Sequence, residues 1–148
     1  MTPVKIYERW LDIKKIKNST TCYFCDKKIP MWSDFNPFCS PKCTDEYHIR
    51  SSLKFLREKT LKRDKGICKD CGINCIKAEK LIRILKKEND QIGVESLLKF
   101  WQFDAHRSYW EADHIDPVFK GGGQCGLENI QTLCIKCHKI KSKGERKK

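Results

Sequence analysis

The sequence predicts a small α+β protein that zinc ions, as well as an apolar core, hold together. Three observations point to this fold class: ten cysteines among 148 residues, several charged helical stretches, and one glycine-rich segment between strand-like residues. Hydrophobic residues make up 39% of the chain and charged residues 34%, so burial alone would support only a thin core. We therefore expect the cysteines to supply part of the stability through bound metal.

The cysteine spacing is typical of two closed zinc sites. A C-x2-C or C-x3-C pair aims two sulfurs at one point, and two such pairs complete a tetrahedral site without an open position. The remaining two cysteines, Cys75 and Cys125, are interpreted as packing thiols, although Cys75 lies close enough to Cys71 to be an alternative ligand. The two predicted zinc quartets are Cys22, Cys25, Cys39 and Cys43, and Cys68, Cys71, Cys134 and Cys137.

The start of the chain, "MTPVKIYERW", lacks the apolar run of a signal peptide, and no segment reaches transmembrane length. We therefore expect no membrane association. The expected location is a reducing intracellular compartment, the nucleus or the cytoplasm, in which cysteines bind metal rather than form disulfides.

The other elements follow in chain order. Apolar residues spaced along residues 4–16 predict a short amphipathic helix or docking arm, and helical patterns cover 44–64, 78–89 and 95–103. Residues 111–132 predict a long-looped hairpin, and the stretch from Cys134 predicts a helix that ends in a frayed basic tail. We accordingly divide the chain into residues 1–50, an N-terminal arm with a four-cysteine zinc finger, and residues 51–148, which hold the second zinc site and the tail.

The chain is strongly basic. Lysine and arginine number 31 against 19 aspartates and glutamates, a formal charge of +12 that two four-thiolate zinc sites would lower to about +8. Such an excess favours a polyanionic partner, above all nucleic acid, because phosphate neutralisation releases counterions. A lysine-rich composition that merely aids solubility is the alternative interpretation.

Four polar residues near the second quartet predict a further site. The quartet is complete without His138, and neighbouring side chains on a helix diverge by roughly 100 degrees, so His138 should point away from the zinc that Cys137 binds. Upstream, Asp113 and His114 are adjacent and would face opposite sides of a strand. Asn129 opens the returning strand of the predicted hairpin. An ordinary structural role in a strand, a turn or a helix surface is the alternative for each of them.

The order Asp-His, then Asn, then Cys-x2-Cys-His over residues 111–141 resembles the HNH family of nucleases, which have a ββα-metal fold. The segments that carry the likeness are "ADHIDPV", "GGG", "LENIQTLC" and "CHK". Upstream, "CYFC" with "FCSPKC" resembles a treble-clef-like zinc finger. The resemblance implies a ββα-metal HNH core, an N-terminal treble-clef-like finger and connecting helices.

The same resemblance implies a metal-dependent DNA endonuclease that hydrolyses phosphodiester bonds. His114 would be the general base, since an imidazole titrates near neutrality and can take a proton from water. Asp113 and His138 would hold one divalent cation, Mg2+ or Mn2+, that stabilises charge on the phosphoryl oxygens. Asn129 would fix the loop and orient the base through a backbone contact. No small-molecule cofactor is expected.

Lysines beside these residues are expected to contact the phosphates of DNA, namely Lys120, Lys139, Lys141 and Lys143. The alternative to an enzyme is a non-catalytic zinc module that binds nucleic acid or a protein partner. Two four-cysteine sites and the basic charge favour that interpretation equally well.

Overall fold

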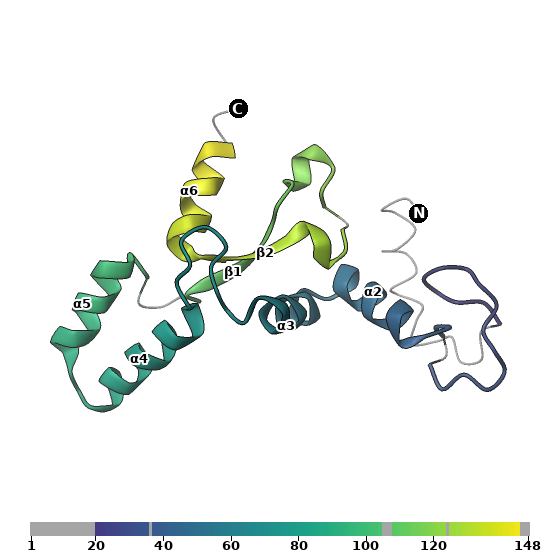
Figure 1. Cartoon of the computed structure of the whole chain (residues 1–148), viewed down its shortest axis with the longest axis horizontal. Helices are drawn as coiled ribbons and strands as arrows, with labels where there is room; N and C mark the ends of the chain where they lie inside the picture. The colour runs from purple at the N-terminus through teal and green to yellow at the C-terminus, as the bar shows by residue number, and fades with distance from the viewer. Residues whose placement is uncertain (1–19, 36, 105–107, 124, 146–148) are drawn as a thin grey trace.

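The structure, a computed structural model, describes residues 20–35, 37–104, 108–123 and 125–145. A hairpin of two antiparallel strands, β1 (Trp110–His114) and β2 (Ile130–Cys134), lies at the centre with helices around it (Figure 1). The helix predicted over residues 4–16 lies outside the described residues. Within the described part of the chain, no helix combines the length and the apolar character that crossing a bilayer requires.

Two helices follow the first cysteine quartet, α2 (Pro41–Ser51) and α3 (Leu53–Asp64), where the sequence pattern predicts one helical stretch over residues 44–64. The break lies at Ser52, whose backbone is extended and whose hydroxyl accepts the N–H of Phe55 to cap α3. A serine in this position satisfies an otherwise unpaired N–H of the first helical turn. The predicted domain boundary after residue 50 falls at the end of α2 and stays a prediction.

Two further predicted helices are present, α4 (Cys75–Lys87) and α5 (Gln91–Trp101), and they pack against each other. Each begins earlier than its hydrophobic pattern indicates. Asn74 accepts the N–H of Lys77 at the start of α4, and Asp90 accepts the N–H of Gly93 at the start of α5. The side-chain caps therefore set both starts.

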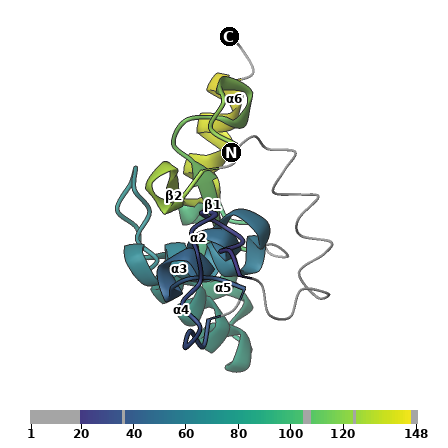
Figure 2. The same cartoon turned by 90° about the vertical axis from the view of Figure 1, so that its right-hand side faces the viewer.

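The hairpin and the last helix form a ββα unit. β1 and β2 pair in a register that runs from Trp110 opposite Cys134 to His114 opposite Ile130. Helix α6 (Ile135–Glu145) follows β2 directly and packs against both strands, while α3 packs against both from the opposite side (Figures 1 and 2). The predicted α+β class is confirmed. The tail that the sequence predicts to fray is instead helical through Glu145.

Each cysteine quartet packs with an apolar cluster of its own, except for Cys71 of the second quartet, which is exposed. The smaller cluster includes Cys22, Ile29, Phe38 and Tyr47. The larger one joins α4, α5, the hairpin and α6, and its centre holds Cys68, Ile82 and Leu133, which are at most 1% exposed. The thiols are thus part of the packing in both clusters.

Candidate active site

The structure gathers the eight predicted zinc ligands into two groups. Within each group the four sulfur atoms lie within 4.8 Å of one another. Sulfur–sulfur distances include 3.5 Å between Cys39 and Cys43 in the first group and 3.6 Å between Cys71 and Cys134 in the second. Four zinc–sulfur bonds of about 2.3 Å at tetrahedral angles would place the sulfurs about 3.8 Å apart, so both groups could hold zinc.

The thiols of these clusters differ in how easily they ionise. Burial opposes ionisation of Cys22, but main-chain hydrogen bonds from Cys25 and Phe24 outweigh it and lower the pKa to about 7, which favours the thiolate that zinc binds. Cys75 is completely buried, and burial raises its pKa to about 12. The second sulfur group does not include Cys75. The environment of Cys75 therefore agrees with a packing thiol rather than an alternative ligand.

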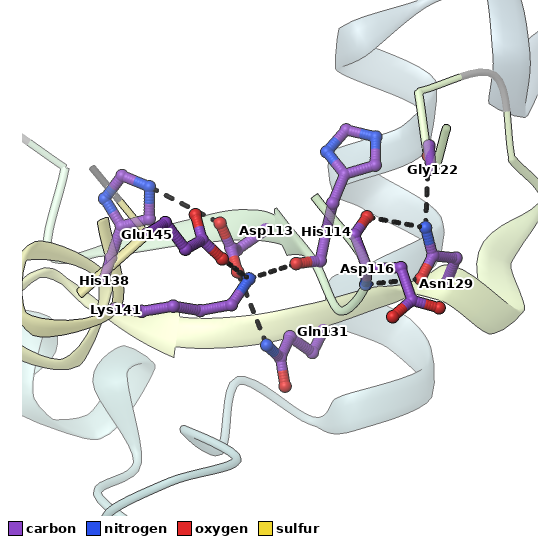
Figure 3. A network of polar contacts seen from close by, with 9 residues as sticks. All are labelled: Asp113, His114, Asp116, Gly122, Asn129, Gln131, His138, Lys141 and Glu145. Atoms are coloured by element: carbon purple, nitrogen blue, oxygen red, sulfur yellow. Dashed lines mark hydrogen bonds and ion pairs between the residues drawn. The ribbon is translucent and has the colours of Figure 1, made fainter. Parts of the chain in front are cut away.

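His138 faces Asp113 and lies apart from the neighbouring sulfur group. Cys137 lies in the first turn of α6 and contributes to that group, and His138 is the next position around the helix. The Nε2 of His138 lies 3.6 Å from Oδ1 of Asp113 (Figure 3). This separation is too long for a hydrogen bond, but two bonds of about 2.1 Å to one ion can span it. A carboxylate oxygen and an imidazole nitrogen so placed fit a divalent cation.

The second oxygen of the Asp113 carboxylate is held by neighbouring donors. Its Oδ2 accepts hydrogen bonds from Lys141 at 2.5 Å and from Nε2 of Gln131, the residue opposite on β2, at 3.4 Å. Lys141 also donates to the main-chain carbonyl of His114 and pairs with Glu145 at 3.2 Å. Burial lowers the pKa of Lys141, but the carboxylates of Asp113 and Glu145 outweigh burial and raise it above its ordinary value.

The ring of His114 points away from the Asp113 carboxylate, toward the loop that joins the strands (Figure 3). Its Nε2 lies 3.2 Å from the carbonyl oxygen of Gly123. Because a carbonyl oxygen only accepts, Nε2 carries a proton in this contact and Nδ1 remains as an acceptor. In a neutral ring with this contact, Nδ1 is the nitrogen that could accept a proton.

Asn129, directly before β2, holds this loop together with its hydrogen bonds. Its Oδ1 accepts the N–H of Asp116 at 2.8 Å, and its Nδ2 donates to the carbonyls of Asp116 and Gly122, each at 3.1 Å. Its own carbonyl accepts the N–H of Ile115 at 2.8 Å. Asn129 thus fixes the segment directly before Gly123, whose carbonyl contacts the His114 ring.

Residues 101–144, which include β1, β2 and α6, match the sequence model of the HNH endonuclease family. This segment belongs to the HNH endonuclease family. The matched segment contains the hairpin, α6 and the Asp113–His138 pair, and two cysteines of the second sulfur group, Cys134 and Cys137.

Two curated relatives of this HNH protein bear the name DNA annealing helicase and endonuclease ZRANB3. The human relative is 34% identical over 120 residues, which is 74% of this chain and 11% of that protein. The relative from Bos taurus is 32% identical over 132 residues, 82% of this chain and 12% of that protein. A crystal structure of the human ZRANB3 HNH domain is 29% identical and covers 64% of this chain and 88% of that chain, with a TM-score of 0.42. The chain spans about a tenth of the length of its curated relatives.

The lysines predicted to contact DNA have different surroundings in the HNH domain. Lys120, Lys139 and Lys143 are exposed, and Lys139 pairs with Asp104 at 2.9 Å. The side chain of Lys141 is only 19% exposed, and its ammonium points into the site. Lys141 lies three residues after His138 and on the same face of α6, the face that meets β1. The DNA contact predicted for Lys141 stays a prediction.

Two further residues belong to the polar contacts around Asp113 and Lys141 but were not predicted from the sequence, namely Gln131 and Glu145. Gln131 reaches Asp113 because the two stand opposite each other in the hairpin, a register that the sequence leaves open. Glu145 follows Lys141 by four residues, the spacing of a helical ion pair, and this signal could have identified it.

Proposed function

We propose that this chain is a metal-dependent endonuclease that hydrolyses phosphodiester bonds in DNA. One observation carries the proposal, the arrangement of three side chains at the end of β1. Asp113 faces His138 of α6, and the ring of the next residue, His114, is held through Nε2, which leaves its other nitrogen to accept a proton. Membership of the HNH endonuclease family supports this reaction class.

Asp113 and His138 would hold the divalent cation. When bound, Mg2+ or Mn2+ supplies Lewis-acid stabilisation of the negative charge that develops on the phosphoryl and leaving oxygens. A carboxylate suits either ion, and an imidazole favours Mn2+ more strongly. The largely buried Asp113 side chain, 15% exposed, keeps its ligand oxygen in a fixed direction.

His114 acts as the general base. Its Nδ1 takes the proton of the attacking water, while the Gly123 carbonyl holds Nε2 and steadies the resulting imidazolium. Asn129 is a positioning residue, because its hydrogen bonds fix the loop that presents this carbonyl. The opposite directions of the two side chains support this division, with proton transfer on one side of β1 and cation binding on the other.

The exposed lysines of the domain supply contacts to DNA. Lys120 lies in the loop beside His114, and Lys139 and Lys143 lie on α6 after His138. Lysine contacts to phosphates position a nucleic acid without reading its sequence. The reduced thiols of both sulfur groups suit a reducing intracellular compartment.

A cleavage panel tests the proposal. Zinc-loaded protein is incubated with branched, single-stranded and duplex DNA, with and without Mg2+ or Mn2+, beside the His114→Ala variant. We expect cleavage that requires the added cation and falls at least about 100-fold in the variant, the range for loss of a general base. Unchanged zinc content and melting temperature show that the variant is folded.

Two outcomes would contradict the proposal. Equal cleavage by His114→Ala would remove the assigned base. Salt-sensitive DNA binding without cation-dependent cleavage would identify the alternative, a non-catalytic zinc module. In parallel, Asp113→Asn and His138→Ala should lose Mn2+ binding and retain both zinc ions, since neither side chain belongs to a sulfur group.

A further inference from the structure

The positively charged ammonium of Lys141 lies beside the proposed cation site. The ammonium of Lys141 contacts oxygens from three residues: Oδ2 of Asp113 at 2.5 Å, the main-chain oxygen of His114, and Oε1 of Glu145 at 3.2 Å (Figure 3). The side chains of Lys141, Asp113 and Glu145 are 19%, 15% and 28% exposed. An ion pair this sheltered is screened by solvent less than a surface pair.

The two oxygens of the Asp113 carboxylate consequently have different partners. Oδ1 faces His138 at 3.6 Å and is the oxygen available to a cation, while Oδ2 is held by Lys141 and Gln131. A carboxylate held in this way presents one oxygen and resists turning to bind an ion with both. The same ammonium fixes the peptide carbonyl of His114, the residue that carries the base.

We propose that Lys141 is a positioning residue of the nuclease site that fixes Asp113 for binding through one oxygen and, by its charge, limits how tightly the divalent cation is held. The inference rests on the proposed function. Outer partners of metal ligands orient them, and their loss typically lowers metal affinity or activity by about 10–100-fold. Here the partner is a cation, so it orients the ligand and at the same time repels the ion that the ligand binds.

Removing the positive charge of Lys141 should therefore raise the affinity for Mn2+ and lower the rate of cleavage. Lys141→Met keeps an unbranched side chain of similar length and leaves the carboxylates of Asp113 and Glu145 without their ammonium. We expect Mn2+ to bind about tenfold more tightly, because one nearby positive charge is gone. We expect cleavage at saturating Mn2+ to fall about tenfold, because the carboxylate and the His114 peptide are no longer fixed. A purely structural loss would weaken both together.

Three further variants sharpen the test. Glu145→Gln removes a negative charge from the same cluster and should weaken Mn2+ binding by about threefold, the opposite sign. Lys141→Arg keeps the charge and the donors and should restore both quantities to within about threefold of wild type. Lys136→Met removes a half-buried lysine from the same helix, and Mn2+ affinity should stay within about twofold because Lys136 takes no part in the ion pairs of Asp113, Lys141 and Glu145.

Mn2+ binding is measured by paramagnetic resonance on zinc-loaded protein, with zinc content and melting temperature as controls for folding. Tighter Mn2+ binding by Lys141→Met together with weaker binding by Glu145→Gln supports the proposal. A folded, zinc-replete Lys141→Met protein that binds Mn2+ no more tightly than wild type overturns it. Wild-type protein that binds Mn2+ but cleaves no DNA would overturn the proposed function, while the two affinity shifts would still decide the effect of the Lys141 charge.

Discussion

At the scale of single residues, the loop between the strands depends on one amide and one glycine. Asn129 makes side-chain hydrogen bonds to Asp116 and Gly122. A Cβ on Gly122 would lie 2.0 Å from the carbonyl oxygen of Asp116 and 2.7 Å from Nδ2 of Asn129, so only glycine allows this close approach. The carbonyl that contacts the His114 ring belongs to the next residue, Gly123. The orientation of the His114 ring therefore depends on the Gly123 carbonyl and, through the loop, on Asn129 and Gly122, which do not touch the ring.

Asn129→Ala should lower cleavage at saturating Mn2+ by about 100-fold, because the loop that orients the His114 ring loses its side-chain bonds and small misplacements of a reacting group are costly. Mn2+ affinity should change by less than about threefold, since Asn129 bonds to the loop rather than to Asp113 or His138. Single-turnover cleavage and Mn2+ titration measure the two effects. Parallel loss of both would indicate that Asn129 supports the whole domain instead.

The directions of the site's side chains were predictable where they depend only on neighbouring residues in the sequence. Strand alternation separates Asp113 from His114, and helical rotation turns His138 away from Cys137, so spacing alone places these groups. Lys141 was not predictable from its type, because lysines are mostly exposed. Its ammonium gives up part of its hydration, and the carboxylates of Asp113 and Glu145 compensate for that loss.

At the scale of elements, α3 fixes the hairpin from the side opposite α6. The carboxylate of Asp64 accepts both the N–H and the hydroxyl of Thr132, a residue of β2 that is completely buried, at 3.0 and 2.9 Å. Hydrogen bonds from Arg63 are the main cause of a lowered pKa for Asp64, and burial opposes them. A lowered carboxyl pKa means that this stabilisation is present at neutral pH and is lost as the pH falls through the folded-state value.

Asp64→Ala should destabilise the protein by about 2 kcal/mol, because the buried hydroxyl and the N–H of Thr132 lose their acceptor. Glu58→Ala, an exposed acidic residue on the same helix, is the matched control and should change the free energy of unfolding by less than about 0.5 kcal/mol. Chemical denaturation at a fixed zinc concentration measures both. Equal effects of the two substitutions would mean that the contact between α3 and β2 is not specific.

Helix existence was predictable from hydrophobic spacing, but helix boundaries were not. The predicted stretch over residues 44–64 divides at Ser52, and α4 and α5 begin at caps formed by Asn74 and Asp90. In each case a polar side chain bonds a main-chain N–H of the first turn. This local chemistry outweighs the hydrophobic pattern, which carries no information on which polar residue will act as a cap.

At the scale of the whole molecule, the sulfur groups that could hold zinc are joined to the apolar packing. The larger apolar cluster brings together Cys68, from the turn after α3, and Cys134 and Cys137, from β2 and α6. The sequence spacing predicted which sulfurs meet, because paired cysteines are a short-range pattern. The placement of α4 and α5 in this cluster was not predictable, since the cluster joins residues distant in sequence, such as Ile82 of α4 and Leu133 of β2.

Removal of one sulfur from the second group should abolish zinc binding there and leave the zinc of the first group in place. Cys68→Ser should retain one equivalent of zinc instead of two and lose the cooperative unfolding of the nuclease part, because binding free energy of a structural zinc, about 10–16 kcal/mol in small domains, is also folding free energy. Cys75→Ala is the matched control: Cys75 lies in the same cluster and is fully buried, but it is outside the sulfur group. This control should retain two equivalents and lose only about 1 kcal/mol of stability.

Zinc content by atomic emission and thermal unfolding by circular dichroism measure the outcome. Two zinc ions and an unchanged transition in Cys68→Ser would show that the second quartet does not hold the nuclease part together. Loss of zinc from Cys75→Ala would instead make Cys75 a ligand. The comparison is decisive because both thiols are buried in one cluster, so packing is disturbed in both variants and zinc ligation differs between them.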